Sequence, residues 1–264
     1  LTCSDKAAEM REKYETMLAF YRLSFDHVLQ AIKEDHVEKG TACIWNLYNM
    51  GYIVKTPSVC FGIDINHRWA WKLEPYFDFL CITHNHRDHQ DAALIEAMLK
   101  AQKPVFSNFI EKGNMSKVPT DYQVKNVKVH VSITDHNNSG MLNNFVSVFT
   151  FECGEDSGNF TLLHTGDSNF KPEQYTNILP RVNVLVTRYA PNALTENNIL
   201  GEGKGKTQPD YVLVSHLLEL MHIDEADCRW SLKSGLIRAA NLNCKKAIVP
   251  MWGEKLIWKN NKLN

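Results

Sequence analysis

The sequence lacks a long apolar run, an excess of charge of one sign and any internal repeat. Its 264 residues contain no stretch near the about 18–20 apolar residues of a membrane span, so we expect no transmembrane segment. Lys and Arg number 29 and Asp and Glu number 30, which gives a formal net charge of −1. This balance disfavours nucleic acid as a partner. The length and the 44% hydrophobic content instead predict a globular protein that buries a sizeable core.

The seven cysteines also lack a pattern. They form no C-x-x-C pair, and their odd number and wide spacing argue against a disulfide framework or a structural zinc site. We expect most of them to be small buried hydrophobes. The chain begins Leu1-Thr2-Cys3-Ser4, without Met, so we expect that an upstream segment has been removed or left out. These residues resemble the end of a lipoprotein signal with Cys3 as the modified residue, which leaves a cytoplasmic and an exported, lipid-anchored location equally open.

Apolar residues at helical spacing characterise the N-terminal segment. From Ser4 to about Glu38 they recur at steps of three or four residues, with charged residues between them. Ser4 can cap the start of this helix and Gly40 its end. We therefore predict a helical extension over residues 1–39 that packs on a main domain over residues 40–264.

After Gly40 the chain alternates between short apolar runs and helical segments. Strands are predicted at Ala42–Leu47, Tyr52–Lys55, Ser58–Ile65, Tyr76–Thr83, Val127–Thr134, Phe145–Cys153, Phe160–Thr165, Val182–Arg188, Tyr211–Ser215 and Lys246–Pro250. Helices are predicted at Asp91–Lys100, Pro172–Ile178 and Glu225–Asn241, and a loop at Leu194–Gln208. This order predicts an α/β protein with two sheets packed together and helices outside.

The strongest functional signal is the sequence H-x-H-x-D-H, which directly follows a predicted strand. It places His84, His86, Asp88 and His89 within six residues. A turn that leaves a strand lets the first two histidines point the same way, while the last two residues turn toward a second point nearby. Neutral imidazole and carboxylate are the ligands that zinc prefers where a position stays open for water. The alternative is a polar surface loop, which this density of ligand-type residues disfavours.

Three further ligand-type residues stand at the ends of predicted strands: His136, Asp167 and His216. One edge of a sheet can gather such side chains from distant parts of the sequence, so we expect them to complete the site. His216 is preferred because it stands directly at a strand end, whereas His222 lies a loop or turn further on. His222 could instead be the ligand, or it could face the substrate.

These residues together resemble the metallo-β-lactamase-fold hydrolase superfamily. The resemblance spans residues 40–253, with H-x-H-x-D-H as its most specific element; Asp64 at the end of an early strand, His136, the pair Gly166-Asp167 and His216 follow in the expected order. It implies an αββα sandwich, two mixed sheets face to face with helices outside, and a site along one edge of the sheets. It also implies a dinuclear metal centre with two Zn²⁺ per chain, Mn²⁺ or Fe²⁺ being alternatives.

The resemblance assigns a role to each residue. It implies that His84, His86 and His136 hold one metal, that Asp88, His89 and His216 hold the second, and that Asp167 bridges them. Asp64 would be an outer carboxylate that fixes the motif loop, or else a turn-forming Asp. Zinc β-lactamases usually carry Cys in place of Asp167, so the chain is more similar to the wider branch of lactonases, phosphodiesterases and RNA-processing nucleases.

The implied function is metal-dependent hydrolysis of a small-molecule substrate. A metal-activated hydroxide would attack an ester, lactone, amide or phosphodiester, and Asp88 would be the catalytic residue that orients this hydroxide or takes its proton. Candidates for lining the pocket are His67, Arg68, Arg188, Tyr189 and His222. Two other functions stay open, a metal-binding protein without catalysis and a di-iron oxidoreductase on the same fold. The oligomeric state stays open as well.

Overall fold

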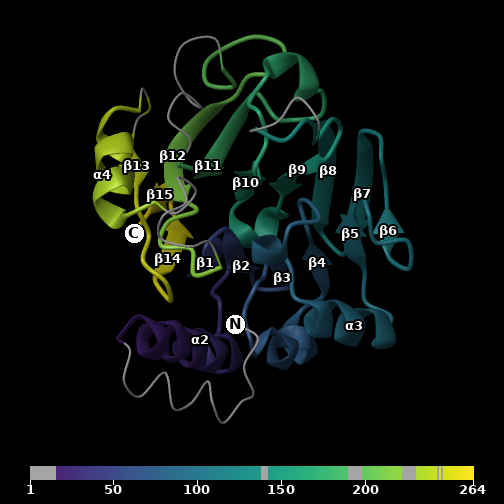
Figure 1. Ribbon diagram of the computed structural model, residues 1–264, viewed down its shortest axis with the longest axis vertical. Coiled ribbons are helices and arrows are strands. Elements are labelled where there is room, and N and C mark those ends of the chain that lie inside the picture. Colours follow the sequence, from purple (N-terminus) through teal and green to yellow (C-terminus); the bar gives the residue numbers. More distant parts are fainter. Residues whose placement is uncertain (1–15, 138–141, 190–197, 222–229, 243, 245) are drawn as a thin grey trace.

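Two β-sheets stacked face to face form the centre of the molecule, as the sequence predicts (Figure 1). The computed structural model describes residues 16–137, 142–189, 198–221, 230–242, 244 and 246–264. The first sheet has the order β15 (Lys262–Leu263), β14 (Lys255–Lys259), β1 (Thr41–Tyr48), β2 (Gly51–Lys55), β3 (Cys60–Ile63), β4 (Phe79–Cys81), β5 (Val105–Ser107), β6 (Asn114–Met115). The second has the order β13 (Ala247–Ile248), β12 (Gln208–Ser215), β11 (Arg181–Arg188), β10 (Thr161–His164), β9 (Val146–Glu152), β8 (Val127–Thr134), β7 (Thr120–Val124).

Strand β1 shows how the layers are held together. Its residues Ala42 and Ile44 belong to the core that the two sheets share, whereas Cys43 and Trp45 belong to the core beneath helix α2 (Thr16–Glu34). All eight residues of β1 are buried. A strand that is buried on both faces reads as a continuous apolar run rather than as an alternating one, which is why this segment is easily found in the sequence.

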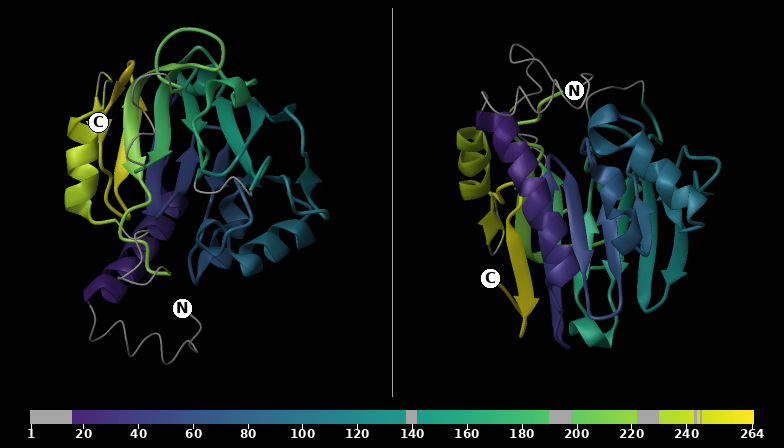
Figure 2. Two further views of the ribbon diagram at one scale, coloured as in Figure 1. Left: turned by 45° about the horizontal axis from the view of Figure 1, so that its top comes forward. Right: turned by 90° about the horizontal axis from the view of Figure 1, so that it is seen from below.

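Helices cover the outer faces of the two sheets. Helix α3 (Ala92–Lys100) contacts β4 and β5 beside α2, and α4 (Leu232–Ala240) contacts β12 and β13 of the second sheet (Figure 2). The expected start of the first helix at Ser4 and the first residues of the helix expected at Glu225–Asn241 lie outside the described residues. Within the described ranges, no helix has the length and hydrophobicity of a membrane span.

The helix predicted at Pro172–Ile178 is wrong. Only the single 3₁₀ turn Pro172–Gln174 forms there. Tyr175 turns into the core, where its hydroxyl bonds to the hydroxyl of Ser168, and Asn177 donates its backbone N–H to Ser132 Oγ (2.8 Å). These contacts with β8 and with the preceding loop keep the residues after Gln174 out of a helix, and they outweigh the helix propensity of the segment.

Parallel pairing brings the candidate residues to one edge. Strands β10, β11 and β12 run parallel, as do β3 and β4. The carboxyl ends of parallel strands lie side by side, so Asp167, Arg188 and His216 emerge close together from the second sheet. In the first sheet, Asp64 follows β3 and lies beside the chain that leaves β4 for the H-x-H-x-D-H turn.

Candidate metal centre

Asp64 holds the H-x-H-x-D-H turn from beneath. Its carboxylate accepts the backbone N–H of Thr83 at Oδ1 (2.7 Å) and the Thr83 hydroxyl at Oδ2 (2.6 Å). Oδ2 also lies 2.8 Å from Nδ1 of His89. Because a carboxylate only accepts hydrogen bonds, this Nδ1 carries the proton, and in the neutral ring Nε2 keeps its lone pair. The structure places Asp64 where an outer-sphere carboxylate is expected.

The Thr83 hydroxyl orients a second histidine in the same way. It donates to Asp64 and accepts from Nδ1 of His84 at 2.9 Å. Nε2 of His84 is therefore the unprotonated nitrogen of the neutral ring. One buried carboxylate thus sets the tautomers of both His84 and His89, and both rings present Nε2 to the centre.

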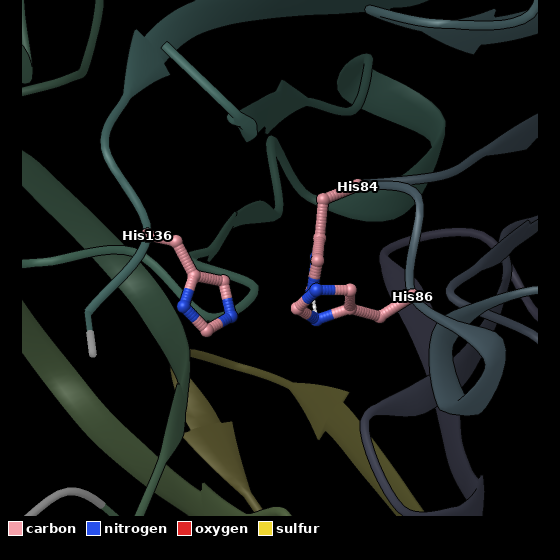
Figure 3. Close-up of side chains that lie close together, drawn as sticks. All are labelled: His84, His86 and His136. Atoms are coloured by element: carbon pink, nitrogen blue, oxygen red, sulfur yellow. Dashed lines mark hydrogen bonds between the residues drawn. The ribbon is translucent and has the colours of Figure 1, made fainter. Parts of the chain in front are cut away.

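The first cluster consists of His84, His86 and His136, whose rings converge in Figure 3. His84 Nε2 lies 3.0 Å from His86 Nδ1, and the ring centroids of His86 and His136 lie 4.8 Å apart. Burial, followed by the charge of His89, lowers the pKa of His84, and burial also lowers the pKa of His86. The neutral imidazole that results is the form that binds metal ions.

The second cluster consists of Asp88, His89 and His216. Asp88 Oδ2 lies 3.3 Å from His89 Nε2 and 3.1 Å from His216 Nε2. Two ligand atoms that each lie 2.0–2.1 Å from a tetrahedral ion are about 3.4 Å apart, so these separations suit one shared ion. The side-chain amide of Asn49 donates to the same Oδ2 (3.1 Å) and fixes the carboxylate.

Asp167 lies between the two clusters. Its Oδ2 is 3.6 Å from His136 Nε2 and 3.5 Å from His216 Nε2, and its Oδ1 is 3.6 Å from His89 Nε2. The preceding Gly166 permits this approach, because a Cβ there would lie 2.6 Å from the Cβ of Thr83, and its φ is +51°. The Gly-Asp pair is therefore a steric requirement for bringing Asp167 to the motif turn.

The polar atoms of the centre fit a metal pair. His89 Nε2 and Asp167 Oδ1 are buried and make no hydrogen bond with any residue that the structure describes. Buried polar atoms are rarely left in this state. The donors are imidazole nitrogens and carboxylate oxygens, which suit Zn²⁺, Mn²⁺ and Fe²⁺.

The charges of the centre also favour a cation. Burial alone would raise the pKa of Asp88, but His89 and His216 outweigh it and lower this pKa. Burial would raise the pKa of Asp167 too, yet His216, Arg188 and His89 hold it well below its ordinary value. For His89, burial is outweighed by Asp88, Asp167 and Asp64, which raise its pKa well above the ordinary value. A bound cation would take the place of the proton on Nε2, which leaves the neutral ring that binds metal ions. The ionised carboxylates thus draw positive charge to this point.

A cavity of about 470 Å³ opens onto both clusters. Its wall contains His86, Asp88, His136, Asp167 and His216, together with Asn85, Arg87, Arg188, Tyr189 and Met221. This volume suits a small molecule. Arg188 and Tyr189 therefore line the pocket as the sequence predicts, whereas His67 and Arg68 line a neighbouring cavity of about 560 Å³. His222 lies outside the described residues.

The sequence pattern does not indicate a role at the site for three residues that contact it: Asn49, Thr83 and Phe145. The Phe145 ring lies against His84, His86 and His136, with centroid distances of 5.6, 5.1 and 6.0 Å. Phe145 stands just before β9, and its contact with the histidines depends on how the two sheets face each other. Of the three, only Asn49 stands in a segment whose sequence indicates a turn, Asn49-Met50-Gly51. In the structure Asn49 adopts a positive φ of 53° there.

Solved structures with the same fold include a metallo hydrolase, a metallo-β-lactamase fold protein and a di-iron β-hydroxylase. A metallo hydrolase of the archaeon Ignicoccus hospitalis has a TM-score of 0.54 and 15% identity, over 83% of this chain and 99% of its own. The metallo-β-lactamase fold protein YhfI of Bacillus subtilis has a TM-score of 0.53 and 13% identity, over 83% and 99%. The di-iron β-hydroxylase CmlA of Streptomyces venezuelae has a TM-score of 0.54 and 13% identity, over 84% of this chain and 54% of its own.

No protein-family model matches the chain, and no curated protein matches its sequence. The structural likenesses show that the chain has the metallo-β-lactamase fold. This is the fold of the superfamily that the sequence resembles.

Proposed function

Given the metallo-β-lactamase fold, we propose that this chain is a metal-dependent hydrolase of small molecules. The observation that carries the proposal is the convergence of seven imidazole and carboxylate side chains from four separate segments, five of these side chains lining one cavity. The bonds open to such a centre are those of an ester, a lactone, an amide or a phosphodiester.

Each ion has its own set of ligands in this proposal. His84, His86 and His136 would hold one ion, Asp88, His89 and His216 would hold the other, and Asp167 would be their shared ligand. The position of Asp167 Oδ2, near Nε2 of both His136 and His216, supports this assignment. We propose Zn²⁺ at both positions, with Mn²⁺ or Fe²⁺ as alternatives. When bound, such ions polarise a carbonyl or phosphoryl oxygen and lower the pKa of a coordinated water to about 7.

Asp88 is the residue that we propose to act on the attacking water. It lines the cavity, and Asn49 and His216 hold its Oδ2. Its lowered pKa keeps the carboxylate ionised at neutral pH, so it can accept a hydrogen bond from the attacking water. Because the same low pKa makes the carboxylate a weak proton acceptor, we propose that Asp88 mainly orients the water or hydroxide. Orientation of the water toward the scissile bond follows from the fixed position of this carboxylate.

A di-iron oxidoreductase is the second candidate. The likeness to the di-iron hydroxylase CmlA supports it, since histidine and carboxylate also suit iron. Iron in the purified protein, together with oxygen-dependent turnover, would favour this candidate. A protein that binds metal and turns over no substrate would favour the non-catalytic alternative.

The test combines metal analysis with a hydrolysis screen. The wild-type protein is loaded with Zn²⁺, its metal content is measured by mass spectrometry, and lactone, thioester and bis-p-nitrophenyl phosphate substrates are offered. The comparison variant is His86→Ala/Asp88→Ala, and the matched control is His130→Ala, because His130 pairs with Asp121 and Glu152 on β7 and β9 at 2.8 Å each. We expect two ions and turnover in the wild type and control, and loss of both in the double variant. Equal turnover in all three proteins contradicts the proposal.

A further inference from the structure

The cavity at the candidate metal centre contains positive charge beyond its proposed ligands. Of the described residues that line it, Arg87 and Arg188 are the charged ones outside the ligand set. Arg188 is the last residue of β11, and it pairs in register with Ser215, which precedes His216. Its side chain is only 5% exposed. A guanidinium buried to this degree at the carboxyl end of a central strand is directed at the site rather than at solvent.

The hydrogen bonding of Arg188 is incomplete. Its Nη1 lies 3.3 Å from Asp167 Oδ2, whereas its Nε is buried and makes no hydrogen bond with any described residue. A guanidinium carries five donors in a rigid planar fork. Leaving one of these donors buried without a hydrogen bond is unfavourable. An acceptor on a molecule that enters the cavity would supply the missing hydrogen bond.

The charge balance of the cavity indicates that this acceptor is an anion. Asp88 and Asp167 are the two carboxylates in the lining. Two divalent ions would more than neutralise them, and Arg188 and Arg87 would then leave the cavity strongly positive. A cavity of this kind attracts anions, and the planar fork of an arginine matches two oxygens of a carboxylate or a phosphoryl group.

We propose that Arg188 binds an oxyanion of the substrate, so that the enzyme prefers substrates that carry a phosphodiester or a carboxylate. This rests on the proposed hydrolase function and narrows its substrate class. Arg188 is then a substrate-binding residue, and its contact with Asp167 aligns the bound oxyanion with the bridging carboxylate. The adjoining Tyr189, whose ring centroid is 5.7 Å from the Arg188 Cζ, forms the cavity wall beside it.

The first test measures binding without turnover. Dimethyl phosphate and acetate are titrated into zinc-loaded wild type, Arg188→Met and Arg188→Lys, with binding followed by NMR. The matched control is Arg181→Met, at the other end of the same strand, where the side chain is 73% exposed and pairs with Asp210. We expect Arg188→Met to weaken binding of at least one anion by about 10- to 100-fold, with Arg181→Met unchanged. Equal affinities in all proteins overturn the inference.

The second test distinguishes two roles of Arg188, binding of the substrate and positioning of Asp167. Turnover is compared for neutral p-nitrophenyl acetate, for mono-p-nitrophenyl succinate, which carries a carboxylate, and for bis-p-nitrophenyl phosphate. We expect Arg188→Met to lower kcat/KM for a charged substrate at least about 10-fold more than for the neutral one, and the more affected substrate identifies the oxyanion. Equal losses on all three substrates, with loss of zinc, mean that Arg188 only supports Asp167 and overturn the inference.

Arg188→Lys keeps the experiment decisive if Arg188→Met does not fold. Lysine retains the charge but not the planar fork, so we expect zinc content to persist while anion affinity falls. If Arg188→Met does not fold, unchanged anion affinity in folded, zinc-loaded Arg188→Lys overturns the inference by itself. If the wild type hydrolyses none of the esters but binds an anion through Arg188, the proposed hydrolase function fails and the anion site stands.

Discussion

At the scale of single residues, the centre depends on one buried carboxylate as much as on the proposed ligands. Asp64 is fully buried and adopts a φ of +49°, a left-handed conformation that a non-glycine residue rarely adopts. In this conformation it reaches Thr83 and His89 together. The strain of its backbone, of order 1–3 kcal/mol, is offset by three hydrogen bonds to a charged acceptor.

Replacing Asp64 by Asn should weaken metal binding without unfolding the protein. The amide lacks the negative charge that keeps Nδ1 of His89 protonated, so Nε2 is no longer fixed as the ligand atom. We expect the affinity for Zn²⁺ to fall by about 10- to 100-fold, as measured by competition with a chelator. Asp78→Asn is the control, since Asp78 also bonds a strand N–H, that of Cys60 at 3.0 Å, away from the site. Equal zinc affinities in the two variants would contradict this role.

Gly166→Ala should disturb both folding and the metal centre. The new Cβ would meet the Thr83 side chain and would require an unfavourable φ, so we expect the free energy of unfolding to fall by more than about 2 kcal/mol and zinc content to fall with it. Gly40→Ala separates the two causes, because Gly40 has a φ of +80° but a Cβ added there would have no atom within 4 Å. Denaturant unfolding of both variants makes the comparison. A Gly166→Ala loss no larger than that of Gly40→Ala would refute the steric argument.

At the scale of elements, the loop after β12 is held by a buried polar contact. Tyr48 of β1 donates its hydroxyl to Glu219 Oε1 (2.8 Å) and accepts the backbone N–H of Leu220 (2.6 Å). Burial, followed by the charge of Glu219, raises the pKa of Tyr48 well above its ordinary value, so the hydroxyl remains a donor. His216 and Leu218 in the same loop adopt φ values of +63° and +57°. The contact therefore holds a loop whose unusual backbone aims His216 at the centre.

Tyr48→Phe should loosen this loop. It leaves the buried Glu219 without one donor, so we expect a loss of about 1–3 kcal/mol in the free energy of unfolding. Because His216 belongs to the second cluster, we also expect the zinc ion at that cluster to be bound more weakly than the ion at the first cluster. Titration with a chelator and thermal unfolding measure the two effects. Tyr122→Phe is the control, since the Tyr122 hydroxyl bonds the Asn114 carbonyl at the exposed sheet edge (3.4 Å), away from this loop. Simultaneous release of both ions at wild-type affinity would contradict the prediction.

At the scale of the whole molecule, the sequence predicts what is local and misses what depends on long-range register. The H-x-H-x-D-H turn and the ligand-type residues after strands are visible because each lies next to an apolar run. The contact of Arg188 with Asp167 requires the parallel pairing of β10 and β11, which no local pattern contains. Strand β6 has only two residues, both exposed, and β7 has five residues of which three are polar, so neither forms an apolar run that marks a strand in the sequence.

The attachment of the N-terminal helix is a further long-range feature. The His67 ring stacks on Tyr21 and Phe25 of α2, with centroid distances of 3.8 and 4.3 Å. Its Nε2–H donates to the Tyr21 carbonyl (3.0 Å), and its Nδ1 accepts the backbone N–H of Trp69 (3.3 Å). Both nitrogens are thus used by the neutral ring, and burial, the largest cause, lowers the pKa of His67 to about 3.

Acid should therefore weaken the folded state through His67. The pKa of His67 is lower in the folded chain than in the unfolded chain, where it is about 6.5. Between these two values the unfolded state binds one more proton than the folded state. The contribution of neutral His67 to the free energy of unfolding is therefore fully present above about pH 6.5 and is lost as the pH falls toward about 3. The slope is about 1.4 kcal/mol per pH unit. In His67→Phe, which keeps the stacking and cannot titrate, we expect lower stability at pH 7 but a flatter decline to pH 4.5. Urea unfolding of the wild type and of His67→Phe across this pH range gives the difference between their free energies of unfolding. The contributions of the other histidines are common to both proteins and cancel in this difference. Parallel curves would mean that α2 is not held by a neutral His67.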